Sequence, residues 1–339
     1  MIELNVAIVG ATGAVGEAFL TVLAERNFPI RNLYPLASSR SVGKTVEFQN
    51  EYFDVLDLAE FDFSQADIAL FSAGGSVSKE YAPKAAAAGC IVIDNSSCFR
   101  YDDDIPLVVP EVNAHRIAEY TNRGIIANPN CSTIQMVVAL KPLYDAAGIS
   151  RINVATYQSV SGTGKRAVSE LIAQMGDLLN GRPAKVEVYP EQIAFNAIPH
   201  IDQFEENGYT REEMKMVWET RKIMEDDSIM VNPTAVRVPV IYGHSEAIHV
   251  ELKNALTAAE ARAILSKAPG VKVIDNVAKA SYPTVIKNVV GHDEVFVGRI
   301  REDISYPNGL NLWVVADNIR KGAASNAIQI AEILNRDYL

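Results

Sequence analysis

The sequence has few cysteines, and their arrangement predicts neither a disulfide framework nor a zinc site. Among 339 residues there are three, Cys90, Cys98 and Cys131, an odd number with no C-x-x-C pair. We therefore expect free thiols and a reducing, cytoplasmic environment. No apolar run approaches the roughly 20 residues that a membrane-spanning helix requires, and the opening Met1–Asn5 lacks the basic region of a signal peptide.

Basic residues are outnumbered, since 31 Lys and Arg face 42 Asp and Glu and give a formal net charge of -11. Such a surface repels a phosphate backbone overall, which argues against non-specific nucleic-acid binding and leaves only local basic pockets. Repeats, low-complexity tracts and long flexible linkers are also missing. With 48% hydrophobic and 22% charged residues, the chain has the composition of a globular protein, and its length predicts two domains.

The stretch around Cys131 has the features of a reactive thiol. It follows the turn signal Asn128-Pro129-Asn130. Apolar residues then recur at helical spacing: Ile134, Met136, Val137, Leu140 and Leu143. A thiol in the first turn of a helix is favoured as thiolate, because the helix dipole and unpaired N–H groups stabilise negative charge. We predict that Cys131 is a nucleophile; the alternative, a buried and inert cysteine, fits poorly with polar Ser132 and Thr133 beside it.

The N-terminal segment has the order of a dinucleotide-binding unit. Leu4 to Val9 is an almost continuous apolar run, typical of a strand buried on both faces. The glycines of the segment from Gly10 to Gly16 follow, and a helical pattern covers Glu17 to Glu25. Glycines let main-chain N–H groups approach a pyrophosphate at a helix N-terminus. A glycine triplet alone indicates only a tight turn, but its place between strand and helix predicts a dinucleotide site.

The second strand, near Asn32 to Ala37, bears on the choice of cofactor. In an NAD site it would end in Asp or Glu, which binds the ribose 2′-hydroxyl. Here Ser38, Ser39, Arg40 and Ser41 follow. Hydroxyls and a guanidinium suit a 2′-phosphate, so we predict NADP, with a solvated basic turn as the alternative.

Two further buried strands, Ile68 to Ser72 and Cys90 to Ile93, are each followed by a polar cluster. Ligands bind at the carboxyl ends of strands in an open α/β sheet. Arg100, in the second cluster, is therefore a candidate anion ligand, and an arginine that only caps a loop is the alternative.

The second half of the chain begins with the Cys131 helix, which Pro142 is expected to kink or end. A strand from Arg151 to Ser159 then leads into a glycine-bearing turn. Within it, Gln158 can supply amide donors and acceptors to a substrate or can be an exposed strand end. Ser161 and Gly162 can approach a cofactor or simply make the turn.

A helix from Tyr209 to Met224 is predicted with Thr210 and Glu213 as a capping box. On it Glu212 and Lys215 are spaced i, i+3 and can share a face, an arrangement that is most often a surface salt bridge. Arg237 lies in the next predicted strand, Thr234 to Ile241.

His244 is expected in a loop between strands, where a neutral imidazole can move protons near pH 7 or only hydrogen-bond locally. Strands at 247–252, 271–275, 294–300 and 310–316 complete a mainly antiparallel second sheet. Asn318 precedes the closing helix, about Ile319 to Leu334, and either contacts the cofactor or caps that helix.

Together these segments resemble the aspartate-β-semialdehyde dehydrogenases over nearly the whole chain. The matching segments are GATGAVG at 10–16, SSRS at 38–41, DNSSCFR at 94–100, NPNCSTIQ at 128–135, QSVSGTGK from 158, EEMK at 212–215, RVPV at 237–240, GHSE from 243 and ADN ending at 318. NPNCST together with GHSE is specific, whereas GATGAVG is not. Two departures, Cys98 in place of a small residue such as Ala and Trp218 near the phosphate-binding helix, affect pocket shape only.

The resemblance implies a reversible, NADP-dependent reductive dephosphorylation of L-4-aspartyl phosphate to L-aspartate 4-semialdehyde, in lysine, methionine, threonine and diaminopimelate biosynthesis, with inorganic phosphate as co-substrate and no metal. It implies Cys131 as the nucleophile, His244 as general acid/base and Gln158 as the group that orients the acyl intermediate. The other implied contacts are Arg237 and Glu212 for the substrate; Arg100, Lys215 and Asn130 for phosphate; and Gly10, Thr12, Gly13, Ala14, Val15, Ser38, Arg40, Ser41, Ser161, Gly162 and Asn318 for the cofactor.

The expected architecture is an α/β Rossmann-type NADP-binding domain at 1–130, onto which a C-terminal helix within 318–339 packs back, and an α+β catalytic and dimerisation domain at 131–317. A homodimer is expected by analogy, with a tetramer also open. Alternatives are an N-acetyl-γ-glutamyl-phosphate reductase, which would not need Glu212 for a free ammonium, and a glyceraldehyde-3-phosphate dehydrogenase, which Arg40 contradicts. A non-catalytic paralogue that acts as a binding module is the third.

Overall fold

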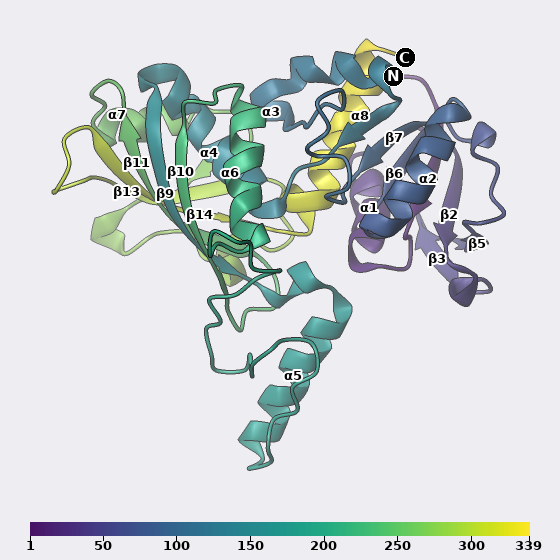
Figure 1. Ribbon diagram of the computed structural model, residues 1–339, viewed down its shortest axis with the longest axis horizontal. Coiled ribbons are helices and arrows are strands. Elements are labelled where there is room, and N and C mark those ends of the chain that lie inside the picture. Colours follow the sequence, from purple (N-terminus) through teal and green to yellow (C-terminus); the bar gives the residue numbers. More distant parts are fainter. The chain divides into compact units, whose positions relative to one another are not determined.

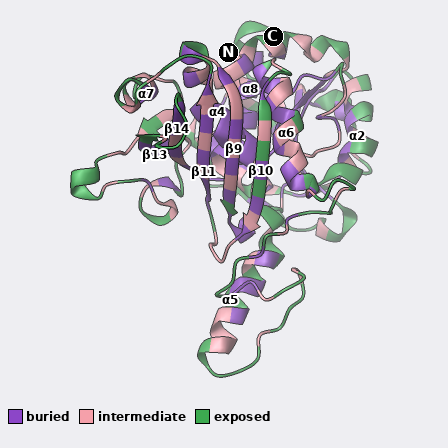
Figure 2. Ribbon diagram, turned by 60° about the vertical axis from the view of Figure 1, so that its left-hand side comes forward, coloured by how far each residue is buried: buried purple, intermediate pink, exposed green.

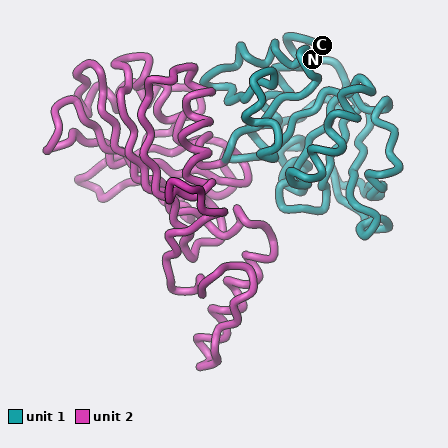
Figure 3. The backbone as a smooth tube through the Cα atoms, in the orientation of Figure 1, with its two compact units in different colours: residues 1–130, 322–339 teal, residues 131–321 magenta.

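The computed structural model describes all residues, 1–339, and divides into two compact units (Figure 3). Unit 1 comprises residues 1–130 and 322–339, and unit 2 comprises residues 131–321. None of the helices combines the length and the apolar character that a membrane crossing requires.

Unit 1 is built on a parallel sheet of six strands in the order β5-β2-β1-β6-β7-β8. The strands are β1 (Leu4–Val9), β2 (Ile30–Ala37), β5 (Leu56–Asp57), β6 (Ile68–Phe71), β7 (Ile91–Asp94) and β8 (Ile125–Ala127). The central strands are apolar on both faces, as expected when helices cover a parallel sheet. Because the chain leaves β1 toward β2 and later returns to its other side as β6, the order reverses there, and ligands bind at the carboxyl ends of the strands at such a point.

The helices of unit 1 are α1 (Ala14–Glu25), α2 (Gly75–Ala87), α3 (Pro110–Asn113) and α8 (Ser325–Asp337), with a small β3 (Thr45–Phe48) and β4 (Glu51–Asp54) hairpin. The C-terminal helix α8 packs against α1 and α3, and its Ala327, Ile328, Ala331 and Leu334 belong to the core of this unit. The last residues of the chain therefore fold with the first.

Unit 2 contains a six-stranded mixed sheet in the order β10-β9-β11-β14-β13-β12. The strands are β9 (Ile149–Gln158), β10 (Met230–Arg237), β11 (His244–Leu252), β12 (Val271–Val273), β13 (Val295–Glu302) and β14 (Gly309–Ala316). The central pairings, β9 with β11, β11 with β14 and β14 with β13, are antiparallel, while β10 and β12 pair in parallel at the two edges. Buried residues line β9 and β11, whereas the edge strand β10 alternates between exposed residues and buried or partly buried ones (Figure 2).

The helices of unit 2 are α4 (Cys131–Ala147), α5 (Lys165–Leu179), α6 (Arg211–Met224) and α7 (Ala258–Leu265). Helix α4 packs on β9, β11, β13 and β14 and against α6. Helix α5 extends away from the sheet, with a small apolar core of its own around Val160, Leu171 and Ile193 (Figure 1). Helix α6 begins with the predicted capping box of Thr210 and Glu213.

The structure differs from three expectations about elements. Of the two outcomes expected at Pro142, an end of the helix is wrong: α4 runs on to Ala147, because packing on both sides holds the helix despite one missing N–H. Strand β10 begins at Met230 rather than Thr234, since an edge strand tolerates Pro233. His244 lies in no loop: it is the first, fully buried residue of β11 and pairs with Ala316.

Candidate active site

The glycine segment of unit 1 forms a cradle that side chains would fill. Gly10 has a φ of +90°, which favours glycine. A Cβ at Gly16 would lie 2.2 Å from the Gly10 carbonyl oxygen, and one at Gly13 would lie 3.2 Å from it. Gly13 caps α1 without a side-chain hydrogen bond, so the first turn of this 12-residue helix, from Ala14, presents main-chain N–H groups. Such a cradle fits a dinucleotide pyrophosphate.

The basic turn after β2 lies at the same edge of the sheet, because β1 and β2 are adjacent and parallel. Ser38 precedes a short turn of Ser39, Arg40 and Ser41 whose side chains are exposed or partly exposed. A flexible guanidinium and two hydroxyls beside the glycine cradle fit a phosphorylated ribose.

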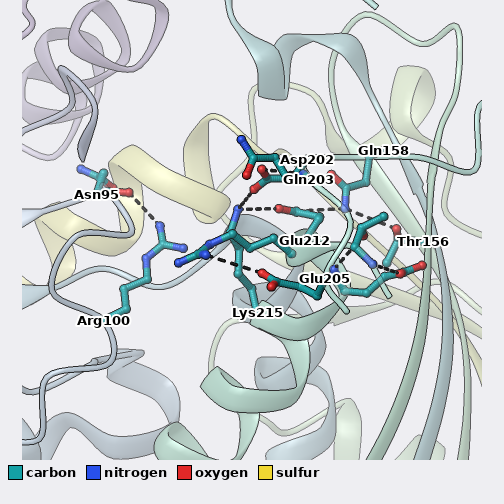
Figure 4. A network of polar contacts seen from close by, with 12 residues as sticks. Asn95, Arg100, Thr156, Gln158, Asp202, Gln203, Glu205, Glu212 and Lys215 are labelled. Carbon is teal, nitrogen blue, oxygen red and sulfur yellow. Dashed lines mark hydrogen bonds and ion pairs between the residues drawn. The ribbon is translucent and has the colours of Figure 1, made fainter. Parts of the chain in front are cut away.

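Arg100 is buried at the carboxyl ends of β7 and β8 rather than placed on the surface. Its Nε donates to the Asn128 carbonyl at 2.9 Å and its Nη2 to the Asn95 carbonyl at 2.7 Å (Figure 4). Asn128 also donates to the Asn95 side chain and accepts from Asn326 of α8, both at 2.7 Å. These main-chain contacts orient the guanidinium at the carboxyl ends of the strands, where ligands bind in an open α/β sheet. Asn130, also buried, is the last residue of the first segment of this unit.

Cys131 opens unit 2 as the first residue of α4 and is partly exposed, as predicted for a thiol at a helix N-terminus. The following polar residues, Ser132 and Thr133, are buried. Since α4 packs directly on β11, the helix that carries the thiol lies against the strand that carries His244.

The His244 ring is oriented by Ser159. The Ser159 main-chain N–H donates to His244 Nδ1 at 3.1 Å, and the Ser159 hydroxyl lies 3.1 Å from the same atom. Because Nδ1 accepts, the neutral ring carries its proton on Nε2, which makes no hydrogen bond within the structure. Burial, and then the charge of Arg237, lower the pKa of His244 from 6.5 to about 3. The ring is therefore a neutral donor at Nε2.

Arg237, at the end of β10, is a buried cation without an ion pair. Its Nη1 donates to the Ser159 carbonyl at 2.7 Å, the guanidinium lies 5.8 Å from the centre of the Tyr189 ring, and Nε has no partner. A buried charge is stable only when it is compensated. Gly162 lies beside it, where a Cβ would be 3.2 Å from Arg237 Nη1 and 3.5 Å from His244 Nε2. The glycine thus preserves space next to both groups for an anionic ligand.

Glu212 and Lys215 form part of a chain of polar contacts in which Glu212 is buried and Lys215 partly buried, so the interpretation of them as a surface pair was wrong. Lys215 donates to Glu212 at 3.0 Å and to Asp202 at 2.8 Å, and Gln158 donates to Glu212 at 3.2 Å (Figure 4). Gln158 also donates to Thr156 at 3.3 Å. Burial opposes the charge on Lys215, but Glu212 and Asp202 outweigh it, and the pKa of Lys215 is raised.

Asn318 joins the turn after β9 to the start of β11. Its Oδ1 accepts from the Ser159 and Ser161 hydroxyls at 3.1 and 3.2 Å and from the Gly243 N–H at 2.8 Å. The alternative that Asn318 caps the closing helix is wrong, because Asp317 accepts from the N–H groups of Ile319 and Arg320 instead.

The structure thus connects Gln158, Ser161, Arg237, Glu212, Lys215, His244 and Asn318 within unit 2, through hydrogen bonds that centre on Gln158 and Ser159. It places Arg100, Asn130, the glycine cradle and the basic turn in unit 1. The sequence analysis missed Ser159, whose only signal was its place after Gln158, and Asp202, which gave none. No group of three or more His, Cys, Asp or Glu is arranged to hold a metal ion.

Comparison with known proteins matches both units to one family. The family description "Semialdehyde dehydrogenase, NAD binding domain" covers residues 5–120, and "Semialdehyde dehydrogenase, dimerisation domain" covers residues 140–321. An aspartate-semialdehyde dehydrogenase of Legionella pneumophila is 81% identical over 337 residues, 99% of this chain and 97% of the relative.

Solved structures agree with this match. Aspartate semialdehyde dehydrogenase II of Vibrio cholerae, complexed with ASA, superposes with a TM-score of 0.98 at 60% identity over 99% of each chain. The Candida albicans aspartate semialdehyde dehydrogenase with NADP superposes with a TM-score of 0.78 at 26% identity over 98% of each chain.

Proposed function

The chain belongs to the aspartate-semialdehyde dehydrogenase family, and we propose that it interconverts L-aspartate 4-semialdehyde and L-4-aspartyl phosphate with NADP and phosphate through an acyl thioester on Cys131. The observation that carries this mechanism is the connected polar network of unit 2. It offers a buried guanidinium without an ion pair, Arg237, which donates to Ser159, and a buried carboxylate, Glu212, which accepts from the neighbouring Gln158.

The charges of this network complement those of the amino acid. Arg237 binds the α-carboxylate as a bidentate donor, which supplies the countercharge that its buried guanidinium lacks. Glu212, held by Gln158 and Lys215, binds the α-ammonium. An N-acetylated substrate has no ammonium to pair with Glu212, which weighs against an N-acetyl-γ-glutamyl-phosphate reductase.

The acyl-transfer chemistry belongs to Cys131, His244 and Gln158. The Cys131 thiolate attacks the aldehyde carbon, and His244 Nε2–H donates to the oxygen that gains negative charge. A nicotinamide cofactor held by the glycine cradle at residues 10–16 would supply the hydride acceptor, so that the adduct on Cys131 would become a thioester while His244 holds the carbonyl oxygen. To act as a base toward the thiol, His244 has to carry its ring proton on Nδ1, which breaks the contact with the Ser159 N–H and leaves the Ser159 hydroxyl as the acceptor. Gln158 orients the acyl group.

Phosphate then attacks the thioester carbon, and the Cys131 thiolate leaves. Arg100, Lys215 and Asn130 bind the phosphate, with charge-assisted contacts from the two cations. Asp202 and Glu212 keep Lys215 charged and limit its movement, as the raised pKa of Lys215 indicates.

The finer assignments about the cofactor and assembly complete the proposal. NADP lies on the cradle of Gly10, Thr12, Gly13, Ala14 and Val15, with its 2′-phosphate at Ser38, Arg40 and Ser41, and further contacts come from Ser161, Gly162 and Asn318. The catalytic domain forms a homodimer, in keeping with the dimerisation-domain match. All three cysteines are free, which suits a cytoplasmic enzyme.

A spectrophotometric assay tests the reaction directly. Purified enzyme is mixed with aspartate semialdehyde and NADP, with and without inorganic phosphate, and NADPH is followed by its absorbance. We expect sustained NADPH formation only with phosphate, and at most one equivalent per active site without it. Sustained turnover without phosphate would contradict the phosphorylating mechanism.

A second assay tests the substrate class. Glu212→Gln should raise the KM for aspartate semialdehyde by roughly 10- to 100-fold, because a charge-assisted hydrogen bond to the ammonium is lost. Higher activity of either enzyme on N-acetyl-glutamate semialdehyde than on aspartate semialdehyde would favour the reductase alternative.

A further inference from the structure

Lys215 is held between two carboxylates, and only one of them binds the substrate in the mechanism above. Its Nζ donates to Glu212 at 3.0 Å and to Asp202 at 2.8 Å (Figure 4). The proposed function assigns the α-ammonium to Glu212 and the phosphate to Lys215, yet these two side chains form an ion pair with one another. Asp202, the closer partner of the lysine, is assigned to no ligand.

The segment that carries Asp202 is fixed to β10 at one end and to α6 at the other. Ile198 and Arg237 exchange two main-chain hydrogen bonds of 2.9 and 2.8 Å, and the Gln203 carbonyl accepts from the Arg211 N–H at 2.7 Å. Asp202 has a φ of +70°, and its Oδ1 accepts from the Gln203 N–H at 2.9 Å. Asp and Asn favour such a turn. The same bond orients the carboxylate, and Oδ2 accepts from the lysine of α6.

The surroundings of these charges decide which contact can be given up. The exposed fraction of the side chain is 7% for Glu212, 12% for Lys215 and 32% for Asp202. A largely buried ammonium needs a carboxylate beside it. When Glu212 binds a substrate ammonium, Asp202 is therefore the partner that Lys215 retains. Without the Asp202 charge, Lys215 would have Glu212 alone, and the substrate ammonium would have to compete with the lysine for that carboxylate.

From these contacts we propose that Asp202 determines the recognition of a free α-amino group, because it retains Lys215 and so leaves Glu212 available to the substrate ammonium. Asp202 is a positioning residue, since it acts through Lys215 and does not touch the substrate. This role rests on the proposed function for the ligands of Glu212 and Lys215. The selected substrates are thus short aldehydes that carry a free amino group.

The test removes the charge of Asp202 and keeps its shape. Asn also adopts the left-handed conformation and can accept from the Gln203 N–H, so Asp202→Asn preserves the turn. The substitution is made in the wild-type chain and in Lys215→Met, which lacks the competing cation. Glu205→Gln is the matched control, because Glu205 lies on the same segment but pairs with Arg211 at 3.5 Å.

Two ligands separate recognition of the ammonium from recognition of the rest of the substrate. They are aspartate semialdehyde and succinate semialdehyde, which has the same carbon chain without the amino group. Single-turnover NADPH formation without phosphate gives the half-saturating concentration of aspartate semialdehyde, and succinate semialdehyde is measured by its inhibition constant in the same reaction. This readout does not depend on phosphate binding by Lys215. Steady-state kinetics give the KM for phosphate and kcat.

We expect Asp202→Asn to raise the half-saturating concentration of aspartate semialdehyde and the KM for phosphate by roughly three- to tenfold each at low salt, and by less at high salt. The kcat at saturation and the inhibition constant of succinate semialdehyde should stay within about twofold. In the Lys215→Met chain, Asp202→Asn should change the half-saturating concentration by less than about twofold. Glu205→Gln should match the parent.

Three results would overturn the proposal. The first is an unchanged half-saturating concentration in Asp202→Asn. The second is an equal increase in the Lys215→Met chain, which would mean that Asp202 does not act through the lysine. The third is an equal weakening of succinate semialdehyde, which has no ammonium. Asp202→Gly keeps the positive φ and serves if Asp202→Asn fails to fold. A parent enzyme that does not oxidise aspartate semialdehyde would instead contradict the proposed function.

Discussion

The two units present their candidate ligand sites with different parts of the chain. In unit 1, one continuous loop between β1 and α1 offers main-chain N–H groups, and its requirement is the absence of side chains at Gly10, Gly13 and Gly16. In unit 2, side chains from β9, α6, β10, β11 and the segment after β14 assemble around Gln158 and Ser159. The first site is formed by residues that follow one another in the sequence. The second brings together residues from distant segments of the chain.

The two sites are therefore disrupted by different kinds of substitution. A main-chain cradle tolerates many changes around it but no added Cβ where backbone atoms already touch. A side-chain network tolerates small backbone shifts, but the loss of one member leaves a buried charge or donor without a partner. Substitutions in the glycine cradle should therefore act mainly on cofactor binding, and substitutions of Arg237 or Glu212 mainly on substrate binding.

The largest effect is expected for Cys131→Ala, which should separate catalysis from cofactor binding. We expect kcat to fall by roughly 10⁴-fold or more, because no other group can form the acyl intermediate. NADPH binding, measured by fluorescence titration, should persist because the cradle lies in unit 1. Cys98→Ala is the matched control and should retain turnover. A Cys131→Ala enzyme with near wild-type activity would rule out the covalent mechanism.

The converse test is Gly16→Ala. The new Cβ would lie 2.2 Å from the Gly10 carbonyl oxygen, so the loop has to shift. We expect the Kd for NADPH to rise at least about tenfold and the free energy of unfolding to fall by on the order of 1–3 kcal/mol. Gly75→Ala, at the start of α2, meets no atom within 4 Å and should behave as wild type in titration and urea unfolding. Equal NADPH affinity and equal stability of the Gly16→Ala and Gly75→Ala variants would contradict a cofactor site at the glycine cradle.

Arg40→Ala probes the other part of the unit 1 site. Loss of a charge-assisted contact to the 2′-phosphate should raise the KM for NADP about tenfold, while the KM for NAD stays unchanged. Steady-state kinetics with both cofactors measure the preference, with Lys44→Ala as the control. An unchanged preference would mean that other residues recognise the 2′-phosphate.

The smallest effect concerns the pH dependence of unit 2. Folding lowers the pKa of His244 from 6.5 to about 3, so below pH 6.5 the unfolded chain binds a proton that the folded chain does not. Stability from this group is thus present above pH 6.5 and is lost toward pH 3, by up to about 1.4 kcal/mol per pH unit. Urea unfolding at pH 7.5 and 5.5 should show a smaller loss for His244→Gln than for wild type. As a control, His292→Gln, at an exposed position, should lose as much stability between pH 7.5 and 5.5 as wild type. Equal losses in wild type, His244→Gln and His292→Gln would contradict the lowered pKa of His244.

Much of unit 1 could be predicted because its signals are short-range. The apolar run at Leu4–Val9, the glycines and the helix after them indicate one strand–turn–helix unit, and the structure contains it. The start of α4 at Cys131 was likewise predicted, because a turn signal and a helical pattern meet there. The comparisons confirm the α/β fold and the family.

The predictions that failed depended on packing between distant segments. Pro142 and Pro233 mark breaks by local preference, yet helix packing in one case and an edge position in the other accommodate them. Glu212 and Lys215 have the spacing of a surface pair, and only the tertiary structure shows that Glu212 is buried against Gln158 and Lys215 is partly buried.

The sequence by itself determined the order of elements, the family and the residue types that can carry the chemistry, because these depend on spacing along the chain. Only the tertiary structure decided the protonation site of His244, the lack of an ion pair at Arg237 and the contacts that Gln158 makes with Glu212. The reason is physical: burial and the partners of a polar group arise from residues that are tens to hundreds of positions apart in the chain, and those partners determine its charge state.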